Sequence, residues 1–159
     1  MGTLSLVCYF DNENVMPTAD NKNVIKTFIE EVLNEGRFER LDELVLEDFV
    51  ELDPLPGQSQ GREGLREVLR QMRAAFPDIH WVVDEMIGEA DKVCTRFTWT
   101  GTQRGSFLGV PATGRHVAVK GIVIDRLNGG KMADSRILMD TLSMMQQLGV
   151  VPASGASGQ

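Results

Sequence analysis

Residues 120–149 read KGIVIDRLNGGKMADSRILMDTLSMMQQLG, and this stretch decides the fold. Two apolar runs, 121–127 and 131–139, flank an Asn128-Gly129 pair, which between strand-like runs is the strongest short-range signal for a β-hairpin. Residues 142–148 then carry apolar side chains at helical spacing, and Gly149 can end a helix in the left-handed conformation. The stretch therefore predicts a strand, a tight turn, a second strand and a short C-terminal helix.

The composition is that of one soluble domain. The chain has 159 residues, of which 42% are hydrophobic and 25% charged, and this length can bury a single core. A net charge of −7 repels phosphate groups, so we expect neither nucleic acid nor a membrane surface as a partner. Two cysteines in unlike settings predict no disulfide framework and no zinc site, which fits a reducing, cytoplasmic location.

The rest of the chain divides into helices followed by strands. Three N-terminal helices are predicted: one from Asn21 to the stop at Gly36, a short second one around Leu41, and a third over 62–76. A short strand is expected at 48–53, and longer strands at 80–89, 92–103, 115–127 and 131–139. We interpret residues 1–20 as a flexible extension, 21–150 as a single α+β domain and 151–159 as a disordered tail.

Three motifs in this order resemble a known family. They are residues 107–115 (FLGVPATGR), the hairpin with Gly129-Gly130-Lys131, and residues 146–149 (QQLG). Together they are similar to the SnoaL-like polyketide cyclase (ester cyclase) family, from near Asn21 to about Pro152. The resemblance implies the cone-shaped fold of the nuclear-transport-factor-two superfamily, in which a bent, mostly antiparallel sheet wraps around helices and leaves a small-molecule pocket.

The reaction that the resemblance implies is an intramolecular aldol condensation without a cofactor or a metal ion. A polar side chain acts as acid and base on a carbon acid whose own electron-withdrawing groups stabilise the enolate. Three positions where the family usually carries two histidines and a carboxylate read Gln103, Leu52 and Ile137 here. Because Ile137 cannot transfer a proton, we hypothesise that the chain does not perform the ester-cyclase reaction at a useful rate and relies on Asp53 or on binding alone.

The remaining polar residues give three catalytic candidates, each with a structural alternative. Asp53 enters a proline-rich loop near the expected pocket mouth, but it also suits the start of a turn before Pro54. Asp140 matches an acidic family position, but an aspartate here is also a good helix N-cap. Gln103 can donate to a carbonyl, although a solvated loop glutamine is the plainer interpretation. The predicted pocket lining is Leu52, Trp81, Trp99, Phe107, Val123, Ser135 and Ile137.

Three functions stay open on this evidence from residues and resemblance. The first is a cofactor-independent cyclase or isomerase acting on an apolar, polyketide-like substrate. The second is a non-catalytic module that binds a small ligand in the same fold, and the third is a hydrolase or hydroxylase that activates water in the same pocket. We also predict a homodimer formed sheet to sheet, because the outer face of the sheet would otherwise expose alternating apolar residues.

Overall fold

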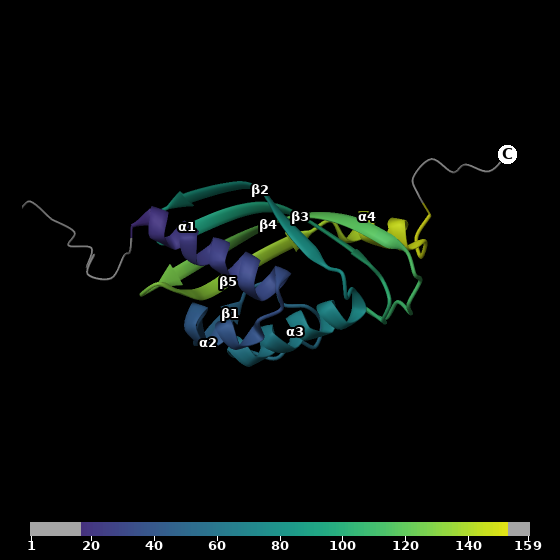
Figure 1. Ribbon diagram of the computed structural model, residues 1–159, viewed down its shortest axis with the longest axis horizontal. Helices are drawn as coiled ribbons and strands as arrows, with labels where there is room; N and C mark the ends of the chain where they lie inside the picture. The colour runs from purple at the N-terminus through teal and green to yellow at the C-terminus, as the bar shows by residue number, and fades with distance from the viewer. Residues whose placement is uncertain (1–16, 153–159) are drawn as a thin grey trace, which may run out of the picture.

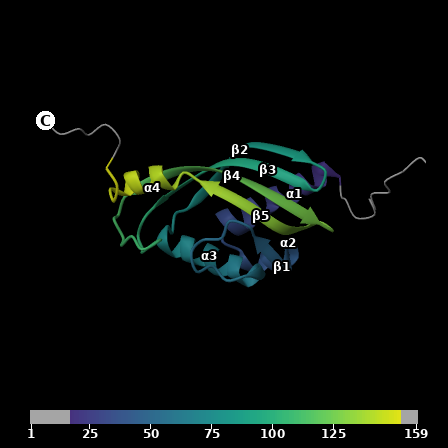
Figure 2. The same ribbon diagram turned by 180° about the vertical axis from the view of Figure 1, so that it is seen from behind.

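The computed structural model describes residues 17–152, and the predicted extension and tail lie largely outside this range. A five-stranded sheet in the order β1-β5-β4-β3-β2 curls over the N-terminal helices. Figure 1 shows α1, α2 and α3 on one side of the sheet and α4 at its far end, and Figure 2 shows the same layers from behind. The chain is α+β, as the sequence predicted.

The first helix is longer than its apolar pattern indicated, because it begins three residues before Asn21. It runs as α1 (Thr18–Thr27) and continues as a π-helical turn over Phe28–Asn34, where Glu35 N donates to Glu30 O five residues back at 3.0 Å. One face buries Ile25, Phe28 and Val32 against the sheet. Gly36 then turns the chain at a φ of 73°, a conformation that a glycine adopts without strain.

A short 3-10 turn (Phe38–Arg40) and α2 (Leu41–Leu44) lead directly into β1 (Val45–Glu51). The strand lies a few residues earlier than the predicted 48–53, because Leu44 and Val45 are buried together at the junction with α2. It pairs in parallel with β5, with Glu51 opposite Ser135, whereas the other strand pairs are antiparallel. The sheet is therefore mixed, with one parallel edge.

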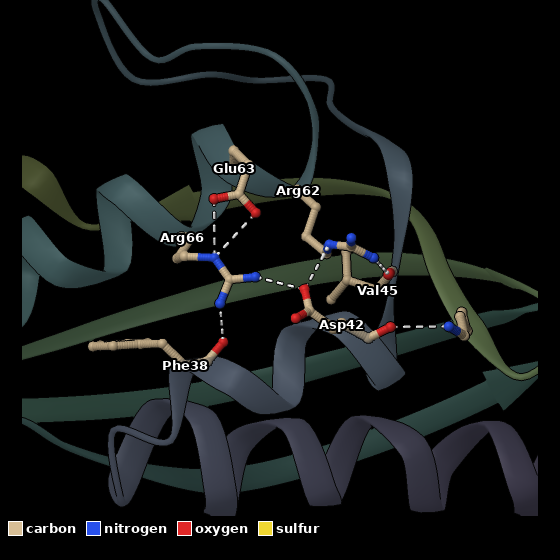
Figure 3. Close-up of polar contacts among 7 residues, drawn as sticks. Phe38, Asp42, Val45, Arg62, Glu63 and Arg66 are labelled. Carbon is tan, nitrogen blue, oxygen red and sulfur yellow. Dashed lines mark hydrogen bonds and ion pairs between the residues drawn. The ribbon is translucent and has the colours of Figure 1, made fainter.

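The long helix α3 (Gly61–Ala75) is held to α2 by an arginine network, drawn in Figure 3. Arg66 donates to Asp42 Oδ1 at 2.7 Å, to both Glu63 oxygens at 3.1 Å, and to the carbonyl oxygen of Phe38. Arg62 lies 3.2 Å from the same Asp42 oxygen and donates to the Val45 carbonyl at 3.2 Å. These bonds fix the start of β1 relative to α3.

The four remaining strands are β2 (His80–Glu89), β3 (Lys92–Thr102), β4 (His116–Asn128) and β5 (Lys131–Met139). Gly129 and Gly130 both have positive φ in the turn between β4 and β5, and Asn128 still pairs with Lys131. The predicted hairpin is therefore confirmed, with its turn one residue later than the Asn128-Gly129 pair. Helix α4 (Thr141–Leu148) ends at Gly149, which takes the left-handed C-cap conformation at a φ of 79°. Within the described residues, no helix is long and apolar enough to cross a membrane.

Candidate functional site

An apolar cavity of about 100 Å³ lies between the inner face of the sheet and the helices. Side chains of the first helix and α3 form one wall, including Phe28, Leu65 and Met72, and the sheet forms the other. Leu55 and Gln58 bring the loop after β1 to its mouth. The alternation of β5 puts Ser135 and Ile137, two of the predicted lining residues, on the cavity side and leaves Arg136 exposed.

Asp125 is the most deeply buried carboxyl group of this cavity, at 3% exposure. Its cross-strand neighbour on β5 is Ser135, whose hydroxyl donates to Asp125 Oδ1 at 2.8 Å. Burial raises the pKa of Asp125 to about 7, the hydrogen bond from Ser135 acts in the opposite direction, and the negative charge of Glu51 adds to the rise. Asp125 is therefore a carboxyl group that can give up or take a proton near neutral pH.

Glu51 is the second carboxyl group on the same level of the sheet. Both Glu51 on β1 and Asp125 on β4 pair with Ser135 on the strand between them. Burial raises the pKa of Glu51 to about 7, and the charges of Asp53 and Asp134 act in the same direction. Glu51 is only half-buried, so the row Glu51, Ser135, Asp125 runs from the mouth of the cavity to its interior. We call this row the polar strip.

Thr95 contributes one further polar group to the cavity wall. It lies on β3 opposite Val123 of β4, is fully buried, and lines the cavity. Its hydroxyl oxygen has no hydrogen-bond partner among the described residues. A buried hydroxyl without a partner is costly, so this group is available to a ligand.

The structure gathers some of the predicted site residues around the cavity and separates others from it. Asp53, Trp81, Val123, Ser135 and Ile137 line the cavity. Trp81 is held in the wall by Asn34, whose side chain bonds both the backbone nitrogen and the carbonyl oxygen of Trp81, at 2.7 and 3.1 Å.

The predicted lining residues Leu52, Trp99 and Phe107 lie elsewhere. Leu52 is 42% exposed, because it follows the cavity-facing Glu51 and the strand alternates. Trp99 is fully buried in the core and packs edge-on against Phe76 at 5.1 Å between ring centroids, and Phe107 packs on the same ring at 5.5 Å. Both aromatic side chains therefore pack against the ring of Phe76, at the end of α3, and do not line the cavity.

Two of the three predicted catalytic residues have structural contacts outside the cavity. Gln103 is fully buried and stabilises the loop that follows it. Its side chain donates to the Val110 carbonyl at 3.1 Å and accepts from the Thr113 backbone nitrogen and hydroxyl at 3.1 and 2.7 Å. Asp140 is exposed and caps α4, accepting from the Ser143 nitrogen at 2.9 Å. The long loop around Phe107 contributes no side chain to the described lining of this cavity.

Asp125, Glu51 and Thr95 were not singled out from the sequence, although a signal for Asp125 was present. Val117, Val119, Val123, Asp125 and Leu127 share one face of β4 by the period of two, so a carboxyl group stands among inward-facing apolar residues. Within residues 17–152, no group of three or more His, Cys, Asp or Glu side chains is arranged to hold a metal ion.

A curled sheet closed by helices around an apolar cavity with a few buried polar groups is the architecture of a small-molecule site. The model of the SnoaL-like polyketide cyclase family matches residues 23–148. The chain belongs to this family.

Solved structures agree with this assignment. The chain is 30% identical to TsrD from Streptomyces laurentii, with a TM-score of 0.79, and the match covers 86% of this chain and 99% of TsrD. It is also 30% identical to wild-type IdmH from Streptomyces antibioticus, proposed to be a polyketide cyclase, with a TM-score of 0.72 over 81% of this chain and 98% of IdmH.

A SnoaL-like polyketide cyclase from Agrobacterium tumefaciens shares the fold at 20% identity, with a TM-score of 0.70 over 84% of this chain and 100% of that one. A search of curated protein sequences gave no match.

Proposed function

We propose that this chain is a cofactor-independent cyclase or isomerase that acts on an apolar, polyketide-like substrate, with Asp125 as its acid and base. The observation that carries the proposal is the position of Asp125: a buried carboxyl group, oriented by Ser135, in a cavity whose walls are otherwise mostly apolar. A general base works best when its pKa lies near the working pH, and burial brings the pKa of Asp125 to about 7.

From the sequence we hypothesised that Ile137 removes the ester-cyclase reaction and leaves Asp53 or binding alone; this proposal replaces that hypothesis, because Asp125 stands close to Ile137 in the same cavity wall. Ile137 pairs with Val123, and Ser135 pairs with Asp125 two residues further along the same two strands. A carboxyl group therefore stands on the neighbouring strand, two residues along the sheet from the place where the family usually carries one. The side chain of Ile137 keeps that part of the wall apolar, which favours a raised pKa in a neighbouring carboxyl group.

In the proposed reaction, the Asp125 carboxylate takes a proton from a carbon next to a carbonyl group of the substrate. The resulting enolate carbon attacks a second carbonyl carbon of the same molecule, a carbon–carbon bond forms, and the new alkoxide takes the proton back from Asp125. Thr95 donates its unused hydroxyl hydrogen to the enolate oxygen, which is the donor that such a step needs. No cofactor takes part, because the substrate carbonyl groups hold the negative charge.

The cavity size requires that its mouth opens for such a substrate. A closed cavity of about 150 Å³ holds a benzene ring, and this one measures about 100 Å³. Leu55 and Gln58 come from a loop that carries two prolines and a glycine at a φ of 81°, and Gln58 accepts from the Leu55 nitrogen at 3.0 Å within the loop. We infer that residues 53–60 move outward when the substrate enters.

A non-catalytic binding module is the second candidate, and the three altered family positions favour it. Gln103, Leu52 and Ile137 replace the side chains that usually carry the chemistry, while the apolar cavity remains. The two candidates differ in one measurable respect, because a binding module holds the ligand without converting it.

The test is to offer a polycyclic polyketide methyl ester to the wild type, to Asp125→Asn and to Asp48→Asn, and to follow the cyclised product by chromatography. Asp48 is an exposed aspartate of β1 and serves as the matched control. We expect product from the wild type and the control, and a loss of roughly a hundred- to ten-thousand-fold in Asp125→Asn. Equal turnover in Asp125→Asn would contradict the role of Asp125. Binding without product in the wild type would favour the binding module.

We further propose that the protein is a homodimer that joins the outer faces of two sheets. Ile122, Ile124 and Leu138 point away from the cavity and are 49%, 42% and 73% exposed, beside the exposed Arg96 and Arg136. Contiguous apolar side chains on a sheet face favour a partner surface over water.

A further inference from the structure

The charged groups of the cavity are all acidic. Glu51, Asp53 and Asp125 line it, and among the described lining residues there is no lysine, arginine or histidine. The first helix and α3 contribute only apolar side chains to this lining. A ligand with a carboxylate or phosphate group would meet like charge in an apolar setting, which disfavours its binding strongly.

The three carboxyl groups differ in depth. Asp53 is exposed, Glu51 is half-buried and Asp125 is buried, so the first two stand at the mouth. Asp53 and Glu51 are also linked, because the Asp53 backbone nitrogen donates to Glu51 Oε1 at 3.3 Å. Glu51 and Asp125 are separated by one strand, which places their backbones roughly 10 Å apart at the usual strand spacing. A small ligand can span this distance.

Thr95 provides an independent sign that the cavity can accept a polar ligand group. Its buried hydroxyl has no hydrogen-bond partner among the described residues and lines the same cavity as the polar strip. A hydroxyl group in this position can donate to a ligand carbonyl oxygen. The cavity therefore offers acceptors for a cation at its mouth and a donor for a carbonyl group further in.

We propose that the ligand of this cavity is an apolar molecule with one protonated amine, held by the carboxylates of Glu51 and Asp53, and a carbonyl group that accepts from Thr95. The substrate class is an apolar aminoketone or amino ester. The apolar body lies against Trp81 and Phe97, whose tilted rings are 4.7 Å apart between centroids and both line the cavity. This inference rests on the proposed function in one respect, that the cavity is the substrate site, and it adds the charge of the substrate.

The charges around Glu51 predict how amine binding depends on pH. The groups that face or influence it are Asp53 in the loop, Asp125 on β4 and Asp134 on β5, all acidic. Burial raises the pKa of Glu51 to about 7, and only its ionised form attracts an ammonium group. Affinity for an amine should therefore rise between about pH 6 and pH 8, and fall again at roughly pH 10, where an alkylamine loses its proton.

The experiment compares three small probes of similar shape, each a phenyl ring on a short chain: 2-phenylethylamine, 2-phenylethanol and 3-phenylpropionate. Their affinities are measured by isothermal titration calorimetry against the full chain at pH 8. We expect the amine to bind at least tenfold more tightly than the alcohol, and the acid more weakly than either, because charge-assisted hydrogen bonds are the strong ones. Only the affinity for the amine should fall between pH 8 and pH 6.

Three variants identify the groups responsible. In Glu51→Gln and in the exposed Asp53→Asn, we expect the preference for the amine over the alcohol to fall to about threefold or less, whereas Glu47→Gln, an exposed glutamate of the same strand, should keep it. Thermal unfolding of each variant shows that it folds. An amine that binds no better than the alcohol, or a preference that survives both changes at the mouth, would overturn the inference.

That failure can be told apart from a failure of the proposed function. If the amine preference is absent but the polyketide methyl ester is still converted in an Asp125-dependent way, the cavity is the active site and its substrate is uncharged. If none of the three probes binds and no ester is converted, both proposals fail.

Discussion

Ser135 donates a hydrogen bond of 2.8 Å to Asp125, and the two residues face each other across β4 and β5. The bond favours the ionised carboxylate, while burial favours the neutral acid and dominates. Because Ser135 also pairs with Glu51 on its other side, one hydroxyl-bearing residue separates Glu51 from Asp125. The relationship gives Ser135 a positioning role that can be measured.

Replacement of Ser135 by alanine should move the pH dependence of turnover. Without the hydroxyl donor the pKa of Asp125 rises further, so the limb of the pH–rate profile that reports the base should shift upward by roughly one to two pH units. Ser135→Thr keeps a hydroxyl group and should restore a profile near that of the wild type. An unshifted profile in Ser135→Ala would show that the bond does not set the pKa of Asp125.

The raised pKa of Asp125 also makes stability depend on pH. A carboxyl group whose pKa is higher in the folded than in the unfolded state stabilises fully below its unfolded pKa of about 4, and this contribution is lost as the pH rises through about 7. Relative to Asp125→Asn, the wild type should therefore lose up to about 4 kcal/mol of unfolding free energy between pH 4 and pH 8.

Urea unfolding of the wild type, Asp125→Asn and the exposed control Asp48→Asn across this pH range measures the effect. A constant difference between the wild type and Asp125→Asn would mean that folding does not raise the pKa of Asp125.

Gln103 should matter for stability and little for chemistry. Its buried side chain makes three hydrogen bonds within its loop, and truncation leaves the Val110 carbonyl and the Thr113 nitrogen without these partners. We expect Gln103→Ala to cost about 2–4 kcal/mol of unfolding free energy, against less than about 0.5 kcal/mol for the exposed Gln71→Ala. Turnover by Gln103→Ala, measured well below its melting temperature, should stay within threefold of the wild-type value. A loss of turnover without a loss of stability would show that Gln103 takes part in catalysis.

The homodimer prediction can be tested at Leu138, the most exposed of the apolar residues on the outer face. A glutamate at this position would bury a charge in the proposed interface, so Leu138→Glu should sediment as a monomer where the wild type is a dimer at micromolar concentration. Leu142→Glu adds the same charge to an exposed apolar position of α4 and should leave the dimer intact. A monomeric wild type would contradict the prediction.

The sequence was most informative where the hydrophobic period is strong and the partners are local. Both ends of β2 and β5 agree with the prediction, because local patterns of apolar residues and, for β5, the glycine turn before it fix them. The cap at Asp140 was also open to prediction, because a cap is a contact between near neighbours.

The site was harder to predict because it depends on contacts between distant segments. Trp99 and Phe107 turn toward Phe76, and Gln103 is buried by the residues of its own loop, none of which a local pattern reveals. The row of Glu51, Ser135 and Asp125 requires the parallel pairing of β1 with β5, which brings together residues more than eighty positions apart. Asp125 could have been found, since it shares the inward face of β4 with the buried Val119 and Leu127.

The central claim is that Asp125 exchanges a proton near neutral pH inside the cavity, and its carboxyl carbon reports this directly. The measurement is a carbon-13 NMR titration of aspartate-labelled protein between pH 3 and pH 9, with Asp125→Asn to identify the signal. We predict one aspartate resonance that titrates near pH 7 and is missing from the variant. A midpoint near pH 4, the value of an ordinary aspartate, would contradict the account.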